Sequence, residues 1–69
     1  MQFNFAITAK NSGGGTVHYI NNSQGERMKE NIYSLRDTFE HKSHAEAKIK
    51  ELSPRYKGLR EWKVEAVRI

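Results

Sequence analysis

Ser43–Tyr56, with the sequence Ser-His-Ala-Glu-Ala-Lys-Ile-Lys-Glu-Leu-Ser-Pro-Arg-Tyr, decides the fold. Its apolar side chains recur at the spacing of one side of an α-helix, and they are Ala45, Ile49, Leu52 and Tyr56. Ser43 and Glu46 have the spacing of a capping box, so we expect the helix to start at Ser43. Pro54 removes a backbone donor, so we expect the regular helix to end near Leu52–Ser53. The stretch predicts one amphipathic helix that covers a sheet.

The residues before this helix predict three strands. Residues 2–9 alternate polar and apolar side chains with the period of two of a half-buried strand. Residues 16–20 are β-branched and aromatic, which is also typical of a strand. Residues 32–39 alternate again, but Asp37 interrupts the apolar side and indicates a bulge or a change of register. We therefore expect a meander of three strands ahead of the helix.

Two turn sequences separate these strands. Asn11-Ser12-Gly13-Gly14-Gly15 predicts a mobile loop or a wide hairpin turn. It is not a phosphate loop, because it lacks the Gly-Lys-Ser/Thr ending and no helix is expected after it. Asn21–Gly25 also consists of turn residues. Residues 26–31 are polar and ambiguous, although they can extend a hairpin arm through Met28.

Residues 60–68 predict the last strand. The predicted fold is a single α+β domain over residues 1–69, a four-stranded, mostly antiparallel sheet with one helix on one face, in the order β-β-β-α-β. We expect a right-handed crossover to place the last strand parallel to the first, and the other sheet face to be open to water or to a partner. The expected core is Phe3, Phe5, Ile7, Val17, Tyr19, Leu35, Phe39, Ala45, Ile49, Leu52, Trp62 and Val64.

Size and composition limit what this domain can do. A chain of 69 residues buries only about 60% of its unfolded surface, which leaves little room for a deep, water-excluded site. There is no cysteine, so disulfides and thiolate metal ligands are excluded. The start, Met1–Phe5, lacks the features of a signal peptide, and no apolar run is long enough to span a membrane. We expect a soluble, cytoplasmic protein.

Basic residues are concentrated in one part of the chain. The sequence has 12 Lys and Arg against 8 Asp and Glu, and residues 42–63 carry the whole net charge of +4. Such clustering favours an acidic protein surface or a nucleic acid as partner, although a solvated helix face is the simpler explanation. The predicted partner-binding surface is Lys42, Lys48, Lys50, Arg55, Lys57, Arg60 and Lys63.

No residue pattern predicts catalysis, a cofactor or a metal. His41 and His44 lie three residues apart, but His18 is remote and a structural zinc site needs four ligands. The serines and acids form no arrangement of nucleophile and base, so we expect no enzyme activity. Tyr56 and Trp62 are expected in the core; an exposed ring there would instead offer a stacking platform for single-stranded nucleic acid.

Residues 38–49, Thr-Phe-Glu-His-Lys-Ser-His-Ala-Glu-Ala-Lys-Ile, resemble the arm-type DNA-binding domain of phage and transposon integrases, in which strands ending in Thr-Phe precede a capped Ser-x-x-Glu-Ala helix. In that family a three-stranded sheet enters the major groove of DNA. The chain departs from the family by a full strand after the helix. The resemblance implies DNA contacts by outward residues of two strands, namely Thr16, His18, Ile20, Arg36 and Thr38.

In size and layout the whole chain also resembles the small stand-alone proteins that phages make against host defences, including anti-CRISPR proteins. Many of these are cysteine-poor, single-sheet proteins that occlude nucleic-acid-binding or protein surfaces. The resemblance implies a phage or mobile-element protein that inhibits or modulates a host nucleic-acid-handling complex by surface contact. The alternative is a DNA- or RNA-binding module that uses the basic helix region or the open sheet face. Either protein is expected as a monomer, or as a homodimer joined through a sheet edge or face.

Overall fold

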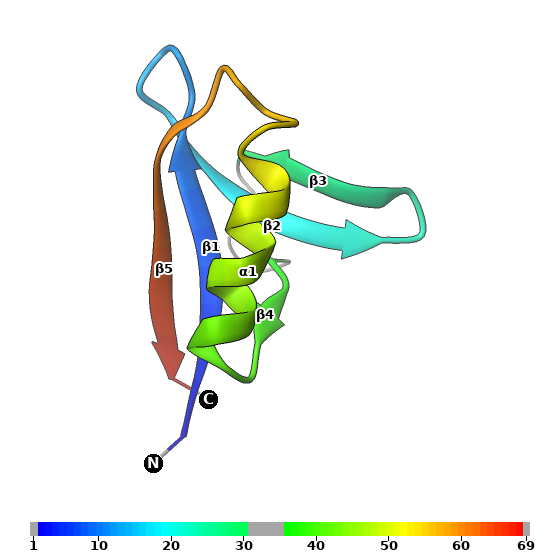
Figure 1. Ribbon diagram of the computed structural model, residues 1–69, viewed down its shortest axis with the longest axis vertical. Coiled ribbons are helices and arrows are strands. Elements are labelled where there is room, and N and C mark those ends of the chain that lie inside the picture. The colour runs from blue at the N-terminus through cyan, green and yellow to red at the C-terminus, as the bar shows by residue number, and fades with distance from the viewer. Residues whose placement is uncertain (1, 31–35, 69) are drawn as a thin grey trace.

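One antiparallel sheet carries one helix on its face in the computed structural model, which describes residues 2–30 and 36–68 (Figure 1). The described strands are β1 (Phe3–Lys10), β2 (Thr16–Asn22), β3 (Gly25–Lys29), β4 (Thr38–Phe39) and β5 (Arg60–Arg68), and helix α1 (Lys42–Leu52) lies between β4 and β5. The predicted α+β class is confirmed. The described order is β-β-β-β-α-β, because the ambiguous residues after the second turn form β3 as a hairpin arm with β2.

Strand β1 is the centre of the sheet. Along one edge it pairs with β5, from Phe3 opposite Arg68 to Lys10 opposite Arg60. Along its other edge β1 pairs with two strands: β2 lies beside its C-terminal end, and β4 lies beside Phe5 and Ala6. Strand β2 then leaves β1 and continues beside β3, so the β2–β3 hairpin projects from the sheet (Figure 1).

The expected parallel crossover to the last strand is wrong, because β5 is antiparallel to β1. Strand β4 runs antiparallel to β1, and α1 returns across the sheet in the direction of β1, so the next strand must run the opposite way (Figure 1). The third predicted strand is confirmed only at Thr38–Phe39. Asp37 lies outside the described strands, although its backbone N–H donates to the Tyr19 carbonyl at 3.0 Å. The prediction for residues 31–35 lies outside the described residues.

The helix starts one residue before the predicted capping box. Its N-cap is His41, which has extended backbone and makes no side-chain cap bond, so the capping box between Ser43 and Glu46 is wrong. The His41 carbonyl already accepts the N–H groups of His44 and Ala45, at 3.1 and 3.3 Å, which places Ser43 inside the first turn. The predicted end is confirmed, because α1 stops at Leu52 ahead of Pro54.

The core lies between α1 and the sheet face beneath it. Its buried members are Ile7, Tyr19, Ala45 and Leu52, and around them pack Phe5, Met28, Phe39, Ile49, Tyr56, Trp62 and Val64. Val17 is buried as predicted. Phe3 is not core, because it is the first residue of β1 and is 45% exposed. Leu35 lies outside the described residues.

The opposite face of the sheet is partly closed. Because Ile7 faces α1, its neighbours Ala6 and Thr8 point to the other side, and His18 pairs with Thr8 there. All three side chains are buried, as is Ile20 on β2. The expectation of an open sheet face is therefore wrong for this region.

Candidate functional site

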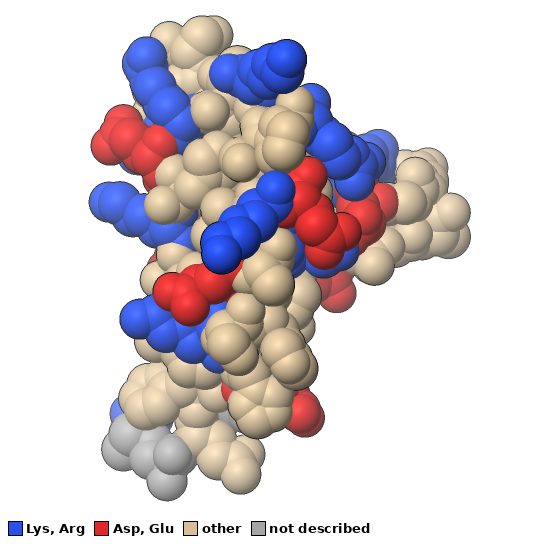
Figure 2. Space-filling model, in the orientation of Figure 1, with Lys and Arg blue, Asp and Glu red and all other residues tan. Residues whose placement is uncertain are grey.

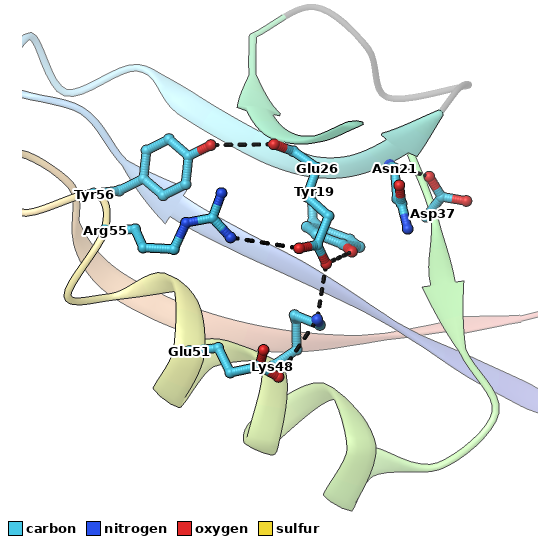
Figure 3. Close-up of polar contacts among 8 residues, drawn as sticks. All are labelled: Tyr19, Asn21, Glu26, Asp37, Lys48, Glu51, Arg55 and Tyr56. Atoms are coloured by element: carbon cyan, nitrogen blue, oxygen red, sulfur yellow. Dashed lines mark hydrogen bonds and ion pairs between the residues drawn. The ribbon is translucent and has the colours of Figure 1, made fainter. Parts of the chain in front are cut away.

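Two of the predicted partner-binding residues belong to a cluster around Glu26 of β3. The Glu26 carboxylate accepts a hydrogen bond from the Tyr19 hydroxyl at 2.6 Å, and it forms ion pairs with Lys48 at 2.8 Å and with Arg55 at 3.4 Å (Figure 3). We call these four residues the Glu26 cluster. The Tyr56 hydroxyl adds a bond to the Glu26 carbonyl at 3.3 Å. The cluster fastens the β2–β3 hairpin to α1 and to the turn after it.

The charges of the Glu26 cluster are fixed by their neighbours. Hydrogen bonds from Lys48 and Tyr19 lower the pKa of Glu26 from 4.5 to about 2. The same carboxylate raises the pKa of Lys48, and burial together with the bond to Glu26 raises the pKa of Tyr19. Glu26 stays ionised and Tyr19 stays protonated near neutral pH, which suits structural contacts rather than proton transfer.

Lys48 and Arg55 are therefore engaged within the fold. Lys48 also contacts Glu51 at 3.4 Å, and its side chain is only 21% exposed. Arg55 is more exposed, and its guanidinium lies 5.9 Å from the centre of the Tyr56 ring. Neutralised in this way, the two side chains contribute little to an outward-facing positive field.

The other five predicted residues are exposed and make no ion pair within the described residues: Lys42, Lys50, Lys57, Arg60 and Lys63. They do not form one surface. Lys42 and Lys50 lie on α1, whereas Lys63 pairs with Thr8 and so points to the sheet face away from the helix. The structure thus divides the predicted surface between the two sides of the sheet.

A second grouping forms at the end of the molecule where β1 ends and β5 begins. Lys10 lies opposite Arg60, and Lys63 lies opposite Thr8 on the same sheet face, while Lys57 occupies the turn that leads into β5. We call Lys10, Lys57, Arg60 and Lys63 the basic end. Figure 2 shows Lys and Arg side chains gathered toward this end, with Asp and Glu side chains between several of them. Lys10 was missed by the sequence reasoning, and the pairing of β1 with β5 is the signal that places it here.

The glycine-rich turn at the basic end is folded on itself. The Asn11 side-chain oxygen accepts the N–H groups of Gly13 and Gly15, at 3.0 and 2.8 Å, and its amide donates to Glu30. Gly14 has a φ of +83°, which favours glycine. Because Asn11 already uses these backbone donors, they are not presented as a cradle for a phosphate.

The residues implied by the integrase resemblance are differently placed. Thr16 and Thr38 are exposed, Arg36 is half-buried, and His18 and Ile20 are buried. Burial and the nearby Arg36 charge lower the pKa of His18, so its imidazole is neutral at physiological pH. These five positions do not share an exposed face.

The remaining candidates are less organised. The rings of His41 and His44 meet edge to face with centroids 5.0 Å apart, but in the described ranges no group of three or more His, Asp or Glu is arranged so that it could hold a metal ion. Tyr56 and Trp62 are half-buried against the core, as predicted. The 11-residue helix is the longest described, and no described helix could cross a bilayer.

Comparisons of the chain with protein-family models, with curated proteins and with solved structures gave no significant match. The function must therefore be argued from the chain's own surface. The basic end is the feature that best distinguishes that surface.

Proposed function

We propose that this chain is a small non-catalytic binding protein of phage or mobile-element origin that inhibits or modulates a host nucleic-acid-handling complex by surface contact. In this proposal the protein acts in the host cytoplasm, and the basic end contacts acidic side chains of a protein partner. The single observation that carries the proposal is the division of basic residues: Lys48 and Arg55 form ion pairs with Glu26, whereas Lys57, Arg60 and Lys63 are exposed and make no ion pair within the described residues. The phage origin and the type of target rest on the resemblance in size and layout.

A protein partner is favoured over a single-stranded nucleic acid by the state of the aromatic rings. Binding of single strands relies on exposed rings that stack against bases. Tyr56 and Trp62 pack against the core cluster, and the Tyr56 hydroxyl is bonded to Glu26. Their faces are poorly available for stacking, whereas lysine and arginine side chains suit a carboxylate-rich protein surface.

The test is affinity capture from a bacterial lysate with two matched triple variants. Lys57→Gln/Arg60→Gln/Lys63→Gln changes the basic end, and the control changes three exposed residues elsewhere with the same loss of charge, Lys29→Gln/Lys42→Gln/Lys50→Gln. We expect the wild type and the control to retain one defined protein partner and the basic-end variant to lose it. Recovery of only bulk nucleic acid, released by salt, would contradict the proposal.

Direct binding to a nucleic-acid duplex is the second candidate. It is favoured by the same exposed cations, because contacts with phosphates need no aromatic platform. Fluorescence anisotropy with a short duplex over a salt series separates the two candidates. Duplex binding predicts an affinity that falls steeply with salt, with a shallower dependence for the basic-end variant than for the control. A protein inhibitor shows little affinity for the duplex at physiological salt.

A further inference from the structure

Strand β5 is an edge strand whose outer side has no partner among the described residues. It pairs with β1 along its inner side, and Figure 1 shows no described segment beyond it. A nine-residue edge strand presents a row of unpaired backbone N–H and C=O groups that can pair with another strand. The side chains of β5 decide which strand fits.

The two charges that flank Val64 in the middle of β5, Lys63 and Glu65, are complementary to themselves about Val64. When two β5 strands pair antiparallel with Val64 opposite Val64, Lys63 of each copy lies opposite Glu65 of the other. Both side chains are exposed and point to the same sheet face, away from α1. Two oppositely charged cross-strand pairs therefore form, symmetrically, in this register.

The neighbouring registers are disfavoured by the same side chains. A shift of about two residues in one direction sets Lys63 opposite its own copy. A shift in the other direction sets Glu65 opposite its own copy. Like charges directly opposite each other are destabilising, so the charges both select one register and protect the edge against others.

The apolar side chains fit the same register. On the helix side, Val64 meets its own copy and Trp62 lies opposite Ala66, a large side chain against a small, exposed one. At Glu61 the φ is 54° and the pairing with β1 shifts, which marks a bulge. The bulge ends the regular strand, so the segment available for pairing centres on residues 62–66.

We propose that β5 pairs antiparallel with β5 of a second copy of this chain, in the register centred on Val64. The two-fold axis is then perpendicular to the sheet, so the two sheets join into one and both α1 helices lie on the same face. Because the two β5 strands run in opposite directions, the basic ends lie at opposite ends of the joined sheet. The proposal does not depend on the proposed function.

Charge-reversal variants and sedimentation equilibrium test it, over about 1 µM to 1 mM of protein. Lys63→Glu alone and Glu65→Lys alone each set like charges opposite one another in both pairs, so each should weaken self-association about tenfold or more. Mixing the two single variants restores both complementary pairs, so a heterodimer should form. The double variant Lys63→Glu/Glu65→Lys should again form a homodimer. Circular dichroism checks that each variant is folded.

Each remaining outcome overturns the proposal. A wild type that is monomeric up to about 1 mM has no β5 dimer of useful affinity. Single variants that associate as strongly as the wild type show that any dimer uses another surface. Failure of the two folded single variants to associate on mixing excludes the register centred on Val64.

Discussion

Removal of the Glu26 carboxylate is the most direct test of how the β2–β3 hairpin is held. In Glu26→Ala the Tyr19 hydroxyl loses its acceptor while the Tyr19 residue remains 3% exposed, and an unsatisfied buried donor costs about 1–3 kcal/mol. Loss of the partly exposed ion pairs with Lys48 and Arg55 adds about 0.5–1 kcal/mol. We expect the free energy of unfolding to fall by about 2–3 kcal/mol.

Thermal and urea unfolding measure this loss. A fall of that size lowers the Tm of a domain this small by about 8–24 °C. Glu46→Ala is the control, because Glu46 is exposed on α1 without an ion pair in the described residues, and it should change stability by no more than about 0.5 kcal/mol. If Glu26→Ala unfolds completely, Glu26→Gln, which keeps an acceptor for Tyr19, replaces it with an expected loss of about 1 kcal/mol.

A double-mutant cycle identifies the source of the loss. Tyr19→Phe removes the hydroxyl that Glu26→Ala leaves without a partner, so it should be nearly neutral in that background and destabilising in the wild type. A Glu26→Ala variant within about 0.5 kcal/mol of the wild type would refute the structural role of the cluster. Additive effects of the two changes would show that the hydroxyl and the carboxylate do not interact.

Three further predictions concern pH and backbone geometry. Because the pKa of Glu26 is lowered from 4.5 to about 2, the stabilisation that ionised Glu26 contributes is fully present above about pH 4.5 and is lost as the pH falls toward 2. After solvent screening, we expect the free energy of unfolding measured with urea to fall by about 1–2 kcal/mol over this range. Glu26→Gln should remove this pH dependence. Gly25, the first residue of β3, has a φ of +98°, so Gly25→Ala should lower the Tm by the equivalent of about 1–2 kcal/mol, whereas Gly13→Ala, without a positive φ, should be close to neutral. Glu61 has a φ of 54°, a backbone conformation that favours glycine and disfavours valine. In urea unfolding, Glu61→Gly should raise the free energy of unfolding by up to about 1 kcal/mol, and Glu61→Val should lower it. Equal stability of the two variants would contradict strain at the bulge.

The parts of the fold that the sequence predicted are those with strong periodic patterns. The alternation predicted in residues 2–9 and 60–68 and the helical spacing through Leu52 correspond to β1, β5 and α1. Strand β3 has a weaker pattern, because Glu26 contacts the rest of the protein through its carboxylate rather than through an apolar side chain. The direction of β5 depends on how the short strand β4 pairs with β1, and residue periodicity contains no information about pairing.

The candidate site was harder to predict because its composition depends on contacts between distant segments. Sequence proximity grouped Lys48 and Arg55 with the other basic residues, but Glu26 comes from a separate hairpin and forms ion pairs with both. Lys10 is remote in sequence from the basic stretch, yet the pairing of β1 with β5 sets it opposite Arg60. A count of charges along the chain therefore overestimates the positive field of the helix and underestimates that of the basic end.

The placement of Glu26 thus links the stability of the hairpin to the distribution of charge. A carboxylate that holds β3 against α1 also cancels positive charge on the helix side, since Lys48 and Arg55 share it. Positive charge without an ion pair in the described residues remains on α1 at Lys42 and Lys50, and it also lies where β1 meets β5, at Lys10, Arg60 and Lys63. Pairing of two β5 strands would cover Lys63 with Glu65 of the other copy but leave Lys10 and Arg60 outside the paired segment. A dimer of this kind would therefore offer two separated basic contacts, and it would suit a partner with two acidic sites better than a single small one.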